Sequence, residues 1–395
     1  MTAAMTGPSP QAVEWLRKLV GFATVSGSES NLGLLEVARA ALEVAGFTAR
    51  FTRSGDGQRA NLFATRGAGP GGLLLSGHTD VVSAEGQQWS RPPFQMTEDA
   101  QRFYGRGTCD MKGFLAAVLA VATRAECLAP ERPLHVALTY DEEIGCLGVR
   151  PMLADLAEAG IRPGACIIGE PTQMRVVRAH KGRHSYRCRV TGHATHSSLS
   201  GTGVNAAEVA CAMVTQVAQL AAAVKQSEHD AGFAVPHSTL ATCRIAAGHA
   251  SNVIPESAEF DFDLRYLPAT DPEAVIDPIR RAVAAAQARM REHVVPSRVV
   301  LECRTSVPAL AHSAAAERIA AAALRAGAKN GLPASYTTEG GLYQAAGIPT
   351  IICGPGSIEQ AHTADEFILK SELAACETFL ENLLGARALS PAAHA

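Results

Sequence analysis

Short apolar segments that lead directly into His, Asp or Glu are the feature of this sequence that most constrains its fold. Such segments predict buried β-strands, and helical patterns lie between them, so we expect an α/β domain with a mostly parallel sheet. The carboxyl ends of parallel strands meet at one edge of a sheet, where ligands gather. The segments are Leu73–Leu75 before His78 and Asp80, Leu134–Thr139 before Glu142 and Glu143, Ala165–Ile168 before Glu170, and Thr350–Cys353 before His362.

A fifth acidic residue, Asp110, stands in the stretch Gly105–Gly113, just before a predicted helix. Apolar residues follow at helical spacing from Phe114 to Ala122. Aspartate is common at helix N-termini, where its charge is favoured, so a capping role is the simplest interpretation of Asp110 alone. Its company with the other acids and histidines suggests instead that it offers one oxygen to each of two metals.

The sequence changes character after about Gly182, which predicts a second domain inserted into the first. Between residues 182 and 306 the expected order is strand, helix, strand, strand, helix, strand, typical of a ferredoxin-like α+β fold. The first domain would then comprise residues 1–181 and 307–395, and we expect the tail from Ala386 to Ala395 to be frayed. Other predicted helices are Gln11–Phe22, Asn31–Ala45, Val149–Ala159, Asn205–Lys225, Asp271–His293, Ala315–Ala326 and Glu372–Leu384; other predicted strands are Phe47–Arg53, Asn61–Thr65, Ser185–Val190, Ser238–Ile245, Ala258–Tyr266 and Val299–Arg304.

Composition argues against several classes of function. The 395 residues carry a formal net charge of −3 without blocks of like charge, and only 5% are aromatic, so neither nucleic acid nor an anionic membrane is an expected partner. The ten cysteines form no C-x-x-C pair, which predicts reduced thiols in a cytoplasmic protein. We predict no signal peptide or membrane span, and we find no complete dinucleotide loop, phosphate-binding lysine loop or Gly-x-Ser-x-Gly turn.

Histidine and carboxylate side chains without cysteine are typical ligands of catalytic zinc or cobalt. Two metals need about six ligand positions, and the candidates supply six if Asp110 counts twice. Taken singly, each candidate has a simpler interpretation, as a buried structural histidine, a solvated acidic loop, the end of a strand or a surface histidine. Their occurrence after successive apolar strands favours a metal site. The candidate ligands are His78, Asp110, Glu143, Glu170 and His362.

Two further carboxylates have expected roles beside the ligands. Glu142 is left over once the ligands are assigned, and a carboxylate next to the site but outside the ligand set suits a general base. Asp80 follows His78 by two residues, so on an extended segment both side chains face the same way. We therefore expect Asp80 to accept the second imidazole N–H of His78 and to fix its tautomer.

The segments that carry these residues resemble the di-zinc aminoacylase/carboxypeptidase family. The resemblance covers nearly the whole chain in the same order, including the insertion. Three segments, Ile168–Thr172, Arg178–Gly182 and Gly354–His362, are typical of a branch that deacetylates a small N-acetyl amino acid. The family-wide segments are Ser76–Asp80, Gly105–Gly113, Asp141–Gly145, Gly169–Thr172 and Gly354–Glu366.

This resemblance implies a role for each candidate residue. His78 and Glu170 would hold one metal, Glu143 and His362 the other, with Asp110 bridging two zinc ions, or cobalt in their place. Glu142 would be the general base in the hydrolysis of the amide of a small N-acyl amino acid. The resemblance also implies a cis peptide bond between Asp110 and Met111.

The inserted domain has implied roles of its own. It would act as a lid and as the contact surface of a homodimer. His196 would reach the substrate across that dimer, and Asn252 and Arg265 would bind the substrate carboxylate.

The resemblance leaves the substrate open. Relatives that remove succinyl groups, and dipeptidases and aminoacylases, share the metal ligands and differ only in the pocket. The role of Glu339 is also open. A non-catalytic binding protein on the same fold would be favoured by loss of the base or a ligand, but this chain has both Glu142 and the full ligand set.

Overall fold

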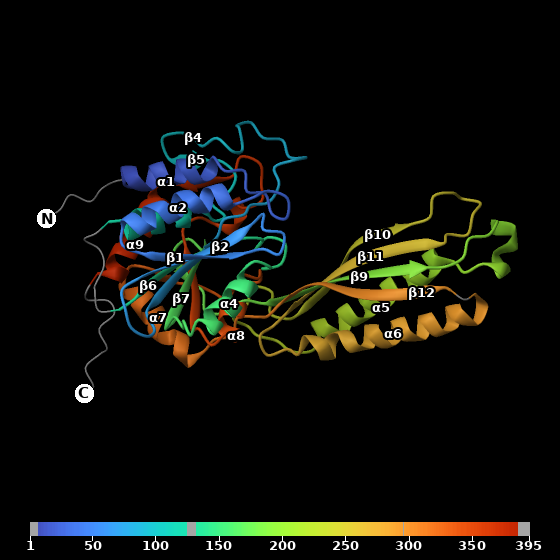
Figure 1. Cartoon of the computed structure of the whole chain (residues 1–395). Coiled ribbons are helices and arrows are strands. Elements are labelled where there is room, and N and C mark those ends of the chain that lie inside the picture. Colours follow the sequence, from blue (N-terminus) through green and yellow to red (C-terminus); the bar gives the residue numbers. More distant parts are fainter. Residues whose placement is uncertain (1–6, 125–131, 295, 386–395) are drawn as a thin grey trace. The chain divides into compact units, whose positions relative to one another are not determined.

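The computed structural model of the chain describes residues 7–124, 132–294 and 296–385, and they divide into two compact units (Figure 1). The first unit comprises Met1–Ala179, His312–Leu332 and Thr338–Ala395, and the second comprises His180–Ala311 and Pro333–Thr337. Residues 180, 181, 307–311 and 333–337 thus fall in the second unit, whereas the sequence analysis assigns them to the first. The tail that was expected to fray lies outside the described residues.

The first unit is built on a six-stranded sheet of order β1-β2-β6-β3-β7-β14. Strands β6, β3, β7 and β14 run parallel, β2 is antiparallel to β6, and β1 is antiparallel to β2. The expectation of a mostly parallel α/β sheet is confirmed. The strands are β1 (Thr48–Arg53), β2 (Ala60–Arg66), β3 (Leu73–His78), β6 (Leu134–Thr139), β7 (Ala165–Pro171) and β14 (Thr350–Gly354).

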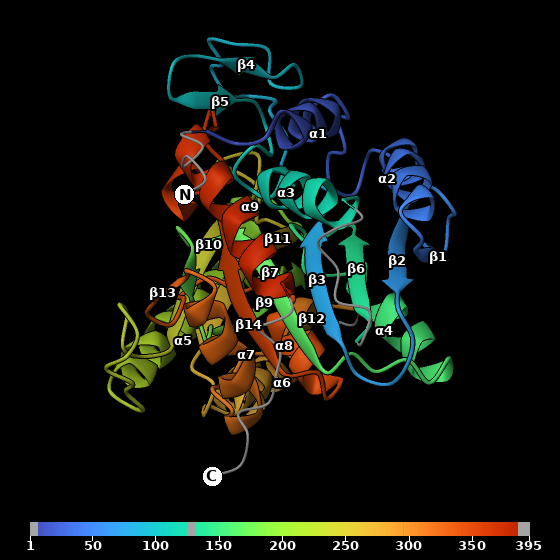
Figure 2. The same ribbon diagram turned by 90° about the vertical axis from the view of Figure 1, so that its left-hand side faces the viewer.

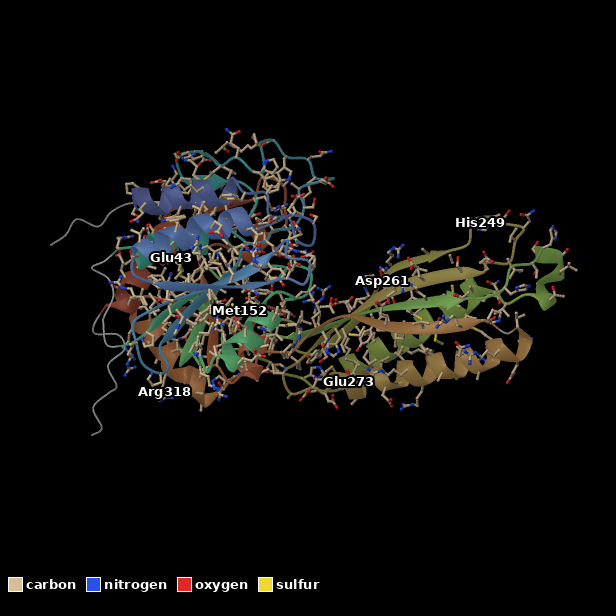
Figure 3. The ribbon with its side chains drawn as sticks, viewed as in Figure 1. Glu43, Met152, His249, Asp261, Glu273 and Arg318 are labelled. Carbon is tan, nitrogen blue, oxygen red and sulfur yellow. The ribbon has the colours of Figure 1, made fainter. Side chains whose placement is uncertain are left out.

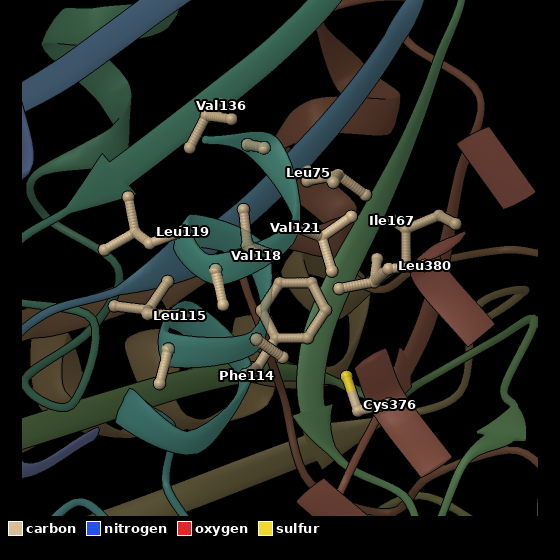
Figure 4. Packing of buried hydrophobic residues seen from close by; sticks show 14 of the residues in the cluster. Leu75, Phe114, Leu115, Val118, Leu119, Val121, Val136, Ile167, Cys376 and Leu380 are labelled. Atoms are coloured by element: carbon tan, nitrogen blue, oxygen red, sulfur yellow. The ribbon is translucent and has the colours of Figure 1, made fainter. Parts of the chain in front are cut away.

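Helix α3 (Lys112–Ala122) lies at the centre of this unit, and all eleven of its residues are buried. It packs against β3 and β7 and is flanked by α1 (Pro10–Val20) and α9 (Lys370–Leu384) (Figure 2). A helix that is apolar on every side is stable only when it is enclosed in this way. The close-up in Figure 4 shows Phe114, Leu115, Val118 and Val121 of α3 among Leu75, Val136 and Ile167 of the sheet and Cys376 and Leu380 of α9.

The remaining helices of the first unit cover the sheet on both faces. Helix α2 packs on β1, β2 and α3, and α7 packs on β7 and β14, whereas α4 and α8 contact each other. Several short elements were not predicted, because two- or three-residue strands carry no periodicity. The remaining elements are α2 (Leu32–Val44), β4 (Thr97–Glu98), β5 (Arg102–Tyr104), α4 (Val149–Glu158), β8 (Arg175–Val176), α7 (Ala314–Arg325), β13 (Lys329–Asn330), α8 (Gly340–Ala345), the 3₁₀ helix η3 (Ile358–Gln360) and β15 (Phe367–Leu369).

The second unit has the predicted ferredoxin-like order, with an antiparallel sheet β10-β11-β9-β12. Side chains alternate along β11: Phe260 and Phe262 face a core formed with the two long helices, whereas Asp261 lies on the opposite, open face (Figure 3). Asn205 and Asp271 cap the helices with their side chains. The elements are β9 (Gly182–Thr191), the 3₁₀ helix η2 (Ser197–Thr202), α5 (Ala206–Lys225), β10 (Thr239–Ala247), β11 (Ser257–Tyr266), α6 (Pro272–His293) and β12 (Arg298–Val307).

Helix α5 combines an apolar composition with unusual exposure. By length and hydropathy it could cross a membrane, but it packs on β9, β10 and β11 of its own unit, as a core helix of similar composition does. Only 22% of its apolar window is buried. The exposed side carries small residues at helical spacing, Cys211, Thr215, Ala218 and Ala222. Helix α5 therefore presents a smooth, weakly polar surface beside the edge strand β10.

Candidate metal centre

Two glycines allow the start of α3 to approach the sheet beside the candidate ligands. Gly77 precedes His78 on β3, and a Cβ at Gly77 would lie 2.6 Å from the Cε of Met111. Gly169 precedes Glu170 on β7, and a Cβ there would lie 1.9 Å from the ring of Phe114. A methyl group at Gly169 would overlap the Phe114 ring, and one at Gly77 would displace the side-chain ends of Met111 and Leu115, because α3 packs directly on both strands. This close approach places the residue before Met111, Asp110, between the ends of the two strands.

Asp110 directs its two carboxylate oxygens at two different groups of side chains. Its Oδ1 lies 3.1 Å from Nε2 of His78, which is 3.9 Å from Oε1 of Glu170. Its Oδ2 lies 3.2 Å from Nε2 of His362, which is 3.0 Å from Oε2 of Glu143. In each group the potential ligand atoms all lie within 4.8 Å of one another. The structure thus brings all five predicted ligands together around Asp110, and the Asp110–Met111 bond is cis as predicted.

A hydrogen bond at Nδ1 fixes the orientation of the His78 imidazole. Its Nδ1 lies 2.9 Å from the backbone oxygen of Asp80, which can only accept, so Nδ1 carries a proton, and Nε2 faces Asp110. The Asp80 carboxylate, expected to be this acceptor, is farther away, with Oδ1 at 3.6 Å. It accepts instead from the backbone N–H groups of Glu142, at 3.2 Å, and Glu143, at 3.3 Å. Asp80 therefore orients the loop of the two glutamates as well as lying beside His78.

Glu142 belongs to neither group of potential ligands. Its side chain is largely enclosed, and the thiol of Cys146 lies 3.4 Å from its Oε1. The preceding residue, Asp141, has a φ of +53° and so turns the chain sharply where β6 ends. This turn lets Glu143 face His362 while Glu142 remains outside both groups of potential ligands.

Burial and crowding shift the protonation of these side chains. Burial raises the pKa of Glu143 to about 7 and raises the pKa values of Glu142 and Glu170 well above their usual range. Burial acts in the same direction on Asp110, but hydrogen bonds from His362 and His78 outweigh it and lower the pKa of that carboxyl. Hydrogen bonds to Asp110 and Glu143 raise the pKa of His362 to about 10. So many buried carboxylates are stable only when protons or cations neutralise them.

The donor set fits two divalent cations. Each group offers one imidazole nitrogen and oxygens from two carboxylates, with Asp110 shared, which is the ligand chemistry of zinc and cobalt sites. The two positions differ in access to solvent, because the His78 side chain is 1% exposed and the His362 side chain is 50% exposed. The residues present are therefore compatible with one enclosed and one open metal position.

Comparison with known sequences decides the family. A sequence model of peptidase family M20/M25/M40 matches residues 74–386, a range that includes every candidate ligand. The chain belongs to this family. The family assignment agrees with the resemblance stated from the sequence, and M20 enzymes are a family of hydrolases.

Curated relatives of this M20 chain include two that match it over most of their length. The acetylornithine deacetylase of Erwinia tasmaniensis is 34% identical over 366 residues, which cover 91% of this chain and 93% of that protein. The acetylornithine deacetylase of Edwardsiella ictaluri is 36% identical over 329 residues, covering 82% of each.

Solved structures share the fold over nearly the whole chain. A tripeptidase from Staphylococcus aureus has a TM-score of 0.76 at 17% identity and covers 98% of this chain and 100% of its own. A dinuclear metal-binding M20 peptidase from Bacillus subtilis has a TM-score of 0.64 at 16% identity, covering 94% and 96%. Identities this low establish the fold alone.

The three residues predicted in the inserted domain do not lie together in the second unit. His196 and Asn252 are exposed and neighbouring, since the backbone N–H of Ser197 donates to the backbone oxygen of Asn252 at 3.0 Å. Arg265 is the ninth of ten residues in β11, which begins only after Asn252. At about 3.4 Å per residue it lies roughly 27 Å from that end of the strand. Arg265 donates to Asp263 at 2.8 Å and to Thr337 at 3.2 Å.

Several supporting residues of the M20 centre escaped the sequence analysis. The Ser26 hydroxyl donates to Oδ2 of Asp80 at 2.7 Å, and Arg59 pairs with Asp141 at 2.8 Å. Glu366 binds the loop that carries Asp110. Ser26 and Arg59 precede the motifs by many residues and carry no local signal. Glu366 ends a recognised segment, but only the structure shows what its carboxylate contacts.

Proposed function

We propose that this chain hydrolyses the amide bond of N-acetyl-L-ornithine to L-ornithine and acetate, a reaction that supplies a precursor of arginine. The observation that supports a hydrolase is Asp110, whose two oxygens face two separate His–Glu pairs while Glu142 remains outside both groups. The choice of substrate is supported by relatives of 34–36% identity that are named acetylornithine deacetylases.

In the proposed mechanism, His78, Glu170 and Asp110 would hold one metal, and Asp110, Glu143 and His362 would hold the other. We propose zinc at both positions, with cobalt able to replace it, because the donors are nitrogen and oxygen without sulfur. The bound metals would polarise the acyl carbonyl and lower the pKa of water at the site.

Glu142 is the proposed general base. It would take a proton from the attacking water and return that proton to the nitrogen of the leaving amine, so the acetyl carbon gains an oxygen as its bond to nitrogen breaks. Burial raises the pKa of Glu142, which suits a carboxylate that must hold a proton between the two steps. The hydrogen bond from its backbone N–H to Asp80 holds the start of its side chain in place.

The proposal is tested by comparing substrates with the purified protein loaded with zinc or cobalt. N-acetyl-L-ornithine should give the highest kcat/KM, by roughly 10-fold or more over N-succinyl-diaminopimelate and simple dipeptides, the difference expected from a pocket that fits one side chain. A preference for the succinylated substrate or for dipeptides would assign the chain to a sibling M20 activity. Binding of N-acetylornithine without turnover of any substrate would indicate a non-catalytic binding protein.

We further propose that the protein is a homodimer formed through the second unit. The edge strand β10 has Ile245 53% exposed, and the adjacent face of α5 carries small residues, a combination suited to pairing with a second copy. Arg265 and Asn252 lie near opposite ends of β11. One chain cannot present both ends to one small substrate, so Arg265 is assigned to one chain, and His196 with Asn252 to its partner.

Subunit mixing tests this arrangement. His196→Ala and Glu142→Ala proteins should each be nearly inactive, but after subunit exchange each heterodimer would contain one complete site. An equal mixture should therefore recover about a quarter of wild-type activity. His249→Ala changes another exposed histidine of the same unit and should keep its activity alone. Mass measurement must first show that subunits have exchanged. If no activity then returns, His196 does not act across a dimer.

We also propose that the protein acts in the cytoplasm. All nine cysteines among the described residues are free, and six of them are buried without a disulfide partner. Thiols in this state persist in a reducing compartment.

A further inference from the structure

The carboxylate of Glu366 is completely buried and fully hydrogen-bonded, although it belongs to neither group of potential ligands. Its Oε1 accepts from the backbone N–H groups of Cys109, at 2.8 Å, and Asp110, at 3.0 Å. Its Oε2 accepts from the N–H of Gly107, at 2.9 Å, and from the guanidinium of Arg106, at 2.8 Å. The side chains of Glu366 and Arg106 are each 1% exposed. Four donors from one loop therefore converge on a single carboxylate.

Glu366 also stands close in sequence to His362, which faces the other oxygen of Asp110. Its backbone oxygen accepts from Gly105 N–H at 2.9 Å, so its main chain and its side chain hold the same loop. The segment before Asp110 and the segment after His362 are thereby joined through one residue. The distance between these two potential ligands depends on that joint.

Arg106 and Gln87 complete the connection on the His362 side. The guanidinium of Arg106 contacts Oε1 of Gln87 at 2.5 Å, and the Gln87 amide donates to the backbone oxygen of His362 at 2.8 Å. Arg106 also lies over the ring of Trp89, which donates to the same Gln87 oxygen. Hydrogen bonds thus connect Asp110 to His362 without a gap, through Glu366, Arg106 and Gln87. His362 itself has a φ of +61°, a conformation that needs such support.

We propose that Glu366 is a positioning residue that fixes Asp110 relative to His362 and so sets the open metal position. This inference rests on the proposed di-metal function. It differs from an ordinary stabilising role, because the four donors belong to the Asp110 loop and not to distant core elements. Loss of the carboxylate should therefore weaken the open position, which shares Asp110 with His362, more than the enclosed position of His78 and Glu170.

Glu366→Gln is the sharpest variant. Glutamine keeps the shape but replaces one oxygen with NH₂, and in either orientation that NH₂ faces backbone or guanidinium donors. The matched control is Glu377→Gln. Glu377 is another buried glutamate of the first unit, which pairs with Arg124 at 2.7 Å and accepts from Ser9, away from every candidate ligand.

The measurements are metal content after dialysis, cobalt titration followed by visible absorption, thermal unfolding of the metal-free protein, and kcat with KM. For Glu366→Gln we expect one tightly held metal and a second that binds roughly 10–100-fold more weakly, with kcat falling and KM nearly unchanged. Added metal should restore part of kcat. Glu377→Gln should lower the unfolding temperature of the metal-free protein comparably, yet keep two metals and full kcat.

A folded Glu366→Gln protein that binds two metals as tightly as the wild type does and has a normal kcat would overturn the inference. If that variant does not fold, Glu366→Asp is used instead, because aspartate keeps the charge but shortens the reach to the four donors. Two tightly held metals in Glu366→Asp would also overturn the inference. Wild-type protein that holds fewer than two metals would instead count against the proposed function itself.

Discussion

Glu142→Ala is expected to lose nearly all turnover while keeping both metals. Positioned proton transfer is worth roughly 10²–10⁴-fold in rate, or about 3–5.5 kcal/mol of activation free energy. The loss at Glu142 should reach or exceed the upper end, because the same carboxylate takes the proton from water and returns it to the amine. Glu142 lies outside both groups of potential ligands, so metal content should stay at the wild-type level. Metal analysis and kinetics on one purified sample make the test.

The neighbouring variant Glu143→Ala is the matched control for Glu142→Ala. Glu143 lies 3.0 Å from Nε2 of His362 within the open group, so its loss should act through metal occupancy, and added zinc should restore part of the activity. The two residues are adjacent in sequence but diverge after the turn at Asp141. An emptied Glu142→Ala beside a loaded Glu143→Ala would mean that base and ligand have been exchanged. Near-normal turnover in Glu142→Ala would remove the proposed base altogether.

Chelation is the second large effect we expect: it should abolish activity while the chain stays folded. Each unit has its own apolar core, and neither core includes a candidate ligand. Metals that bind only the native state raise the free energy of unfolding by mass action, by about 4 kcal/mol when free metal is at 1,000 times Kd. The metal-free protein should therefore unfold at a lower temperature but keep its native circular dichroism at room temperature.

Readdition of zinc or cobalt is the control for this experiment, since activity should return without a refolding step. Magnesium at the same concentration should not restore activity, because a histidine-containing site suits softer ions. Loss of the near-ultraviolet signal at room temperature on chelation would show that the metals hold the fold together.

Much of the fold could be predicted from sequence because its long elements have clear periodicity. The expected strand Leu134–Thr139 has the observed bounds, and the helix expected at Asn205–Lys225 differs by one residue. Helix α8 was missed because it is six residues long and starts with two glycines. Strands β4, β5 and β15 were missed because they are only two or three residues long, and β15 forms by pairing with the distant β5, which no local pattern encodes.

The candidate site, like the fold, could be predicted only in part from the sequence. The ligands could be found because each follows a recognisable strand, or precedes a recognisable helix in the case of Asp110. The contacts that hold them could not be found, since Ser26 reaches Asp80 across 54 residues and Glu366 reaches Asp110 across 256. Asp80 illustrates the limit: its position beside His78 was predicted, but the nearer acceptor for the imidazole is its backbone oxygen. The alternation of side chains along a strand predicts which face a side chain lies on, but not which atom it contacts.

The unequal exposure of the two candidate metal positions bears on how preparations of this protein should be compared. We expect an ion at the enclosed position to exchange with the buffer more slowly than an ion at the open position, because the His78 side chain is 1% exposed and the His362 side chain is 50% exposed. Two batches with the same total metal can then contain different elements side by side, one inherited from the host cell and one from the purification. Specific activities are comparable only between batches whose elemental composition is known for both positions, and deliberate mixed-metal species become accessible by exchanging the outer ion alone.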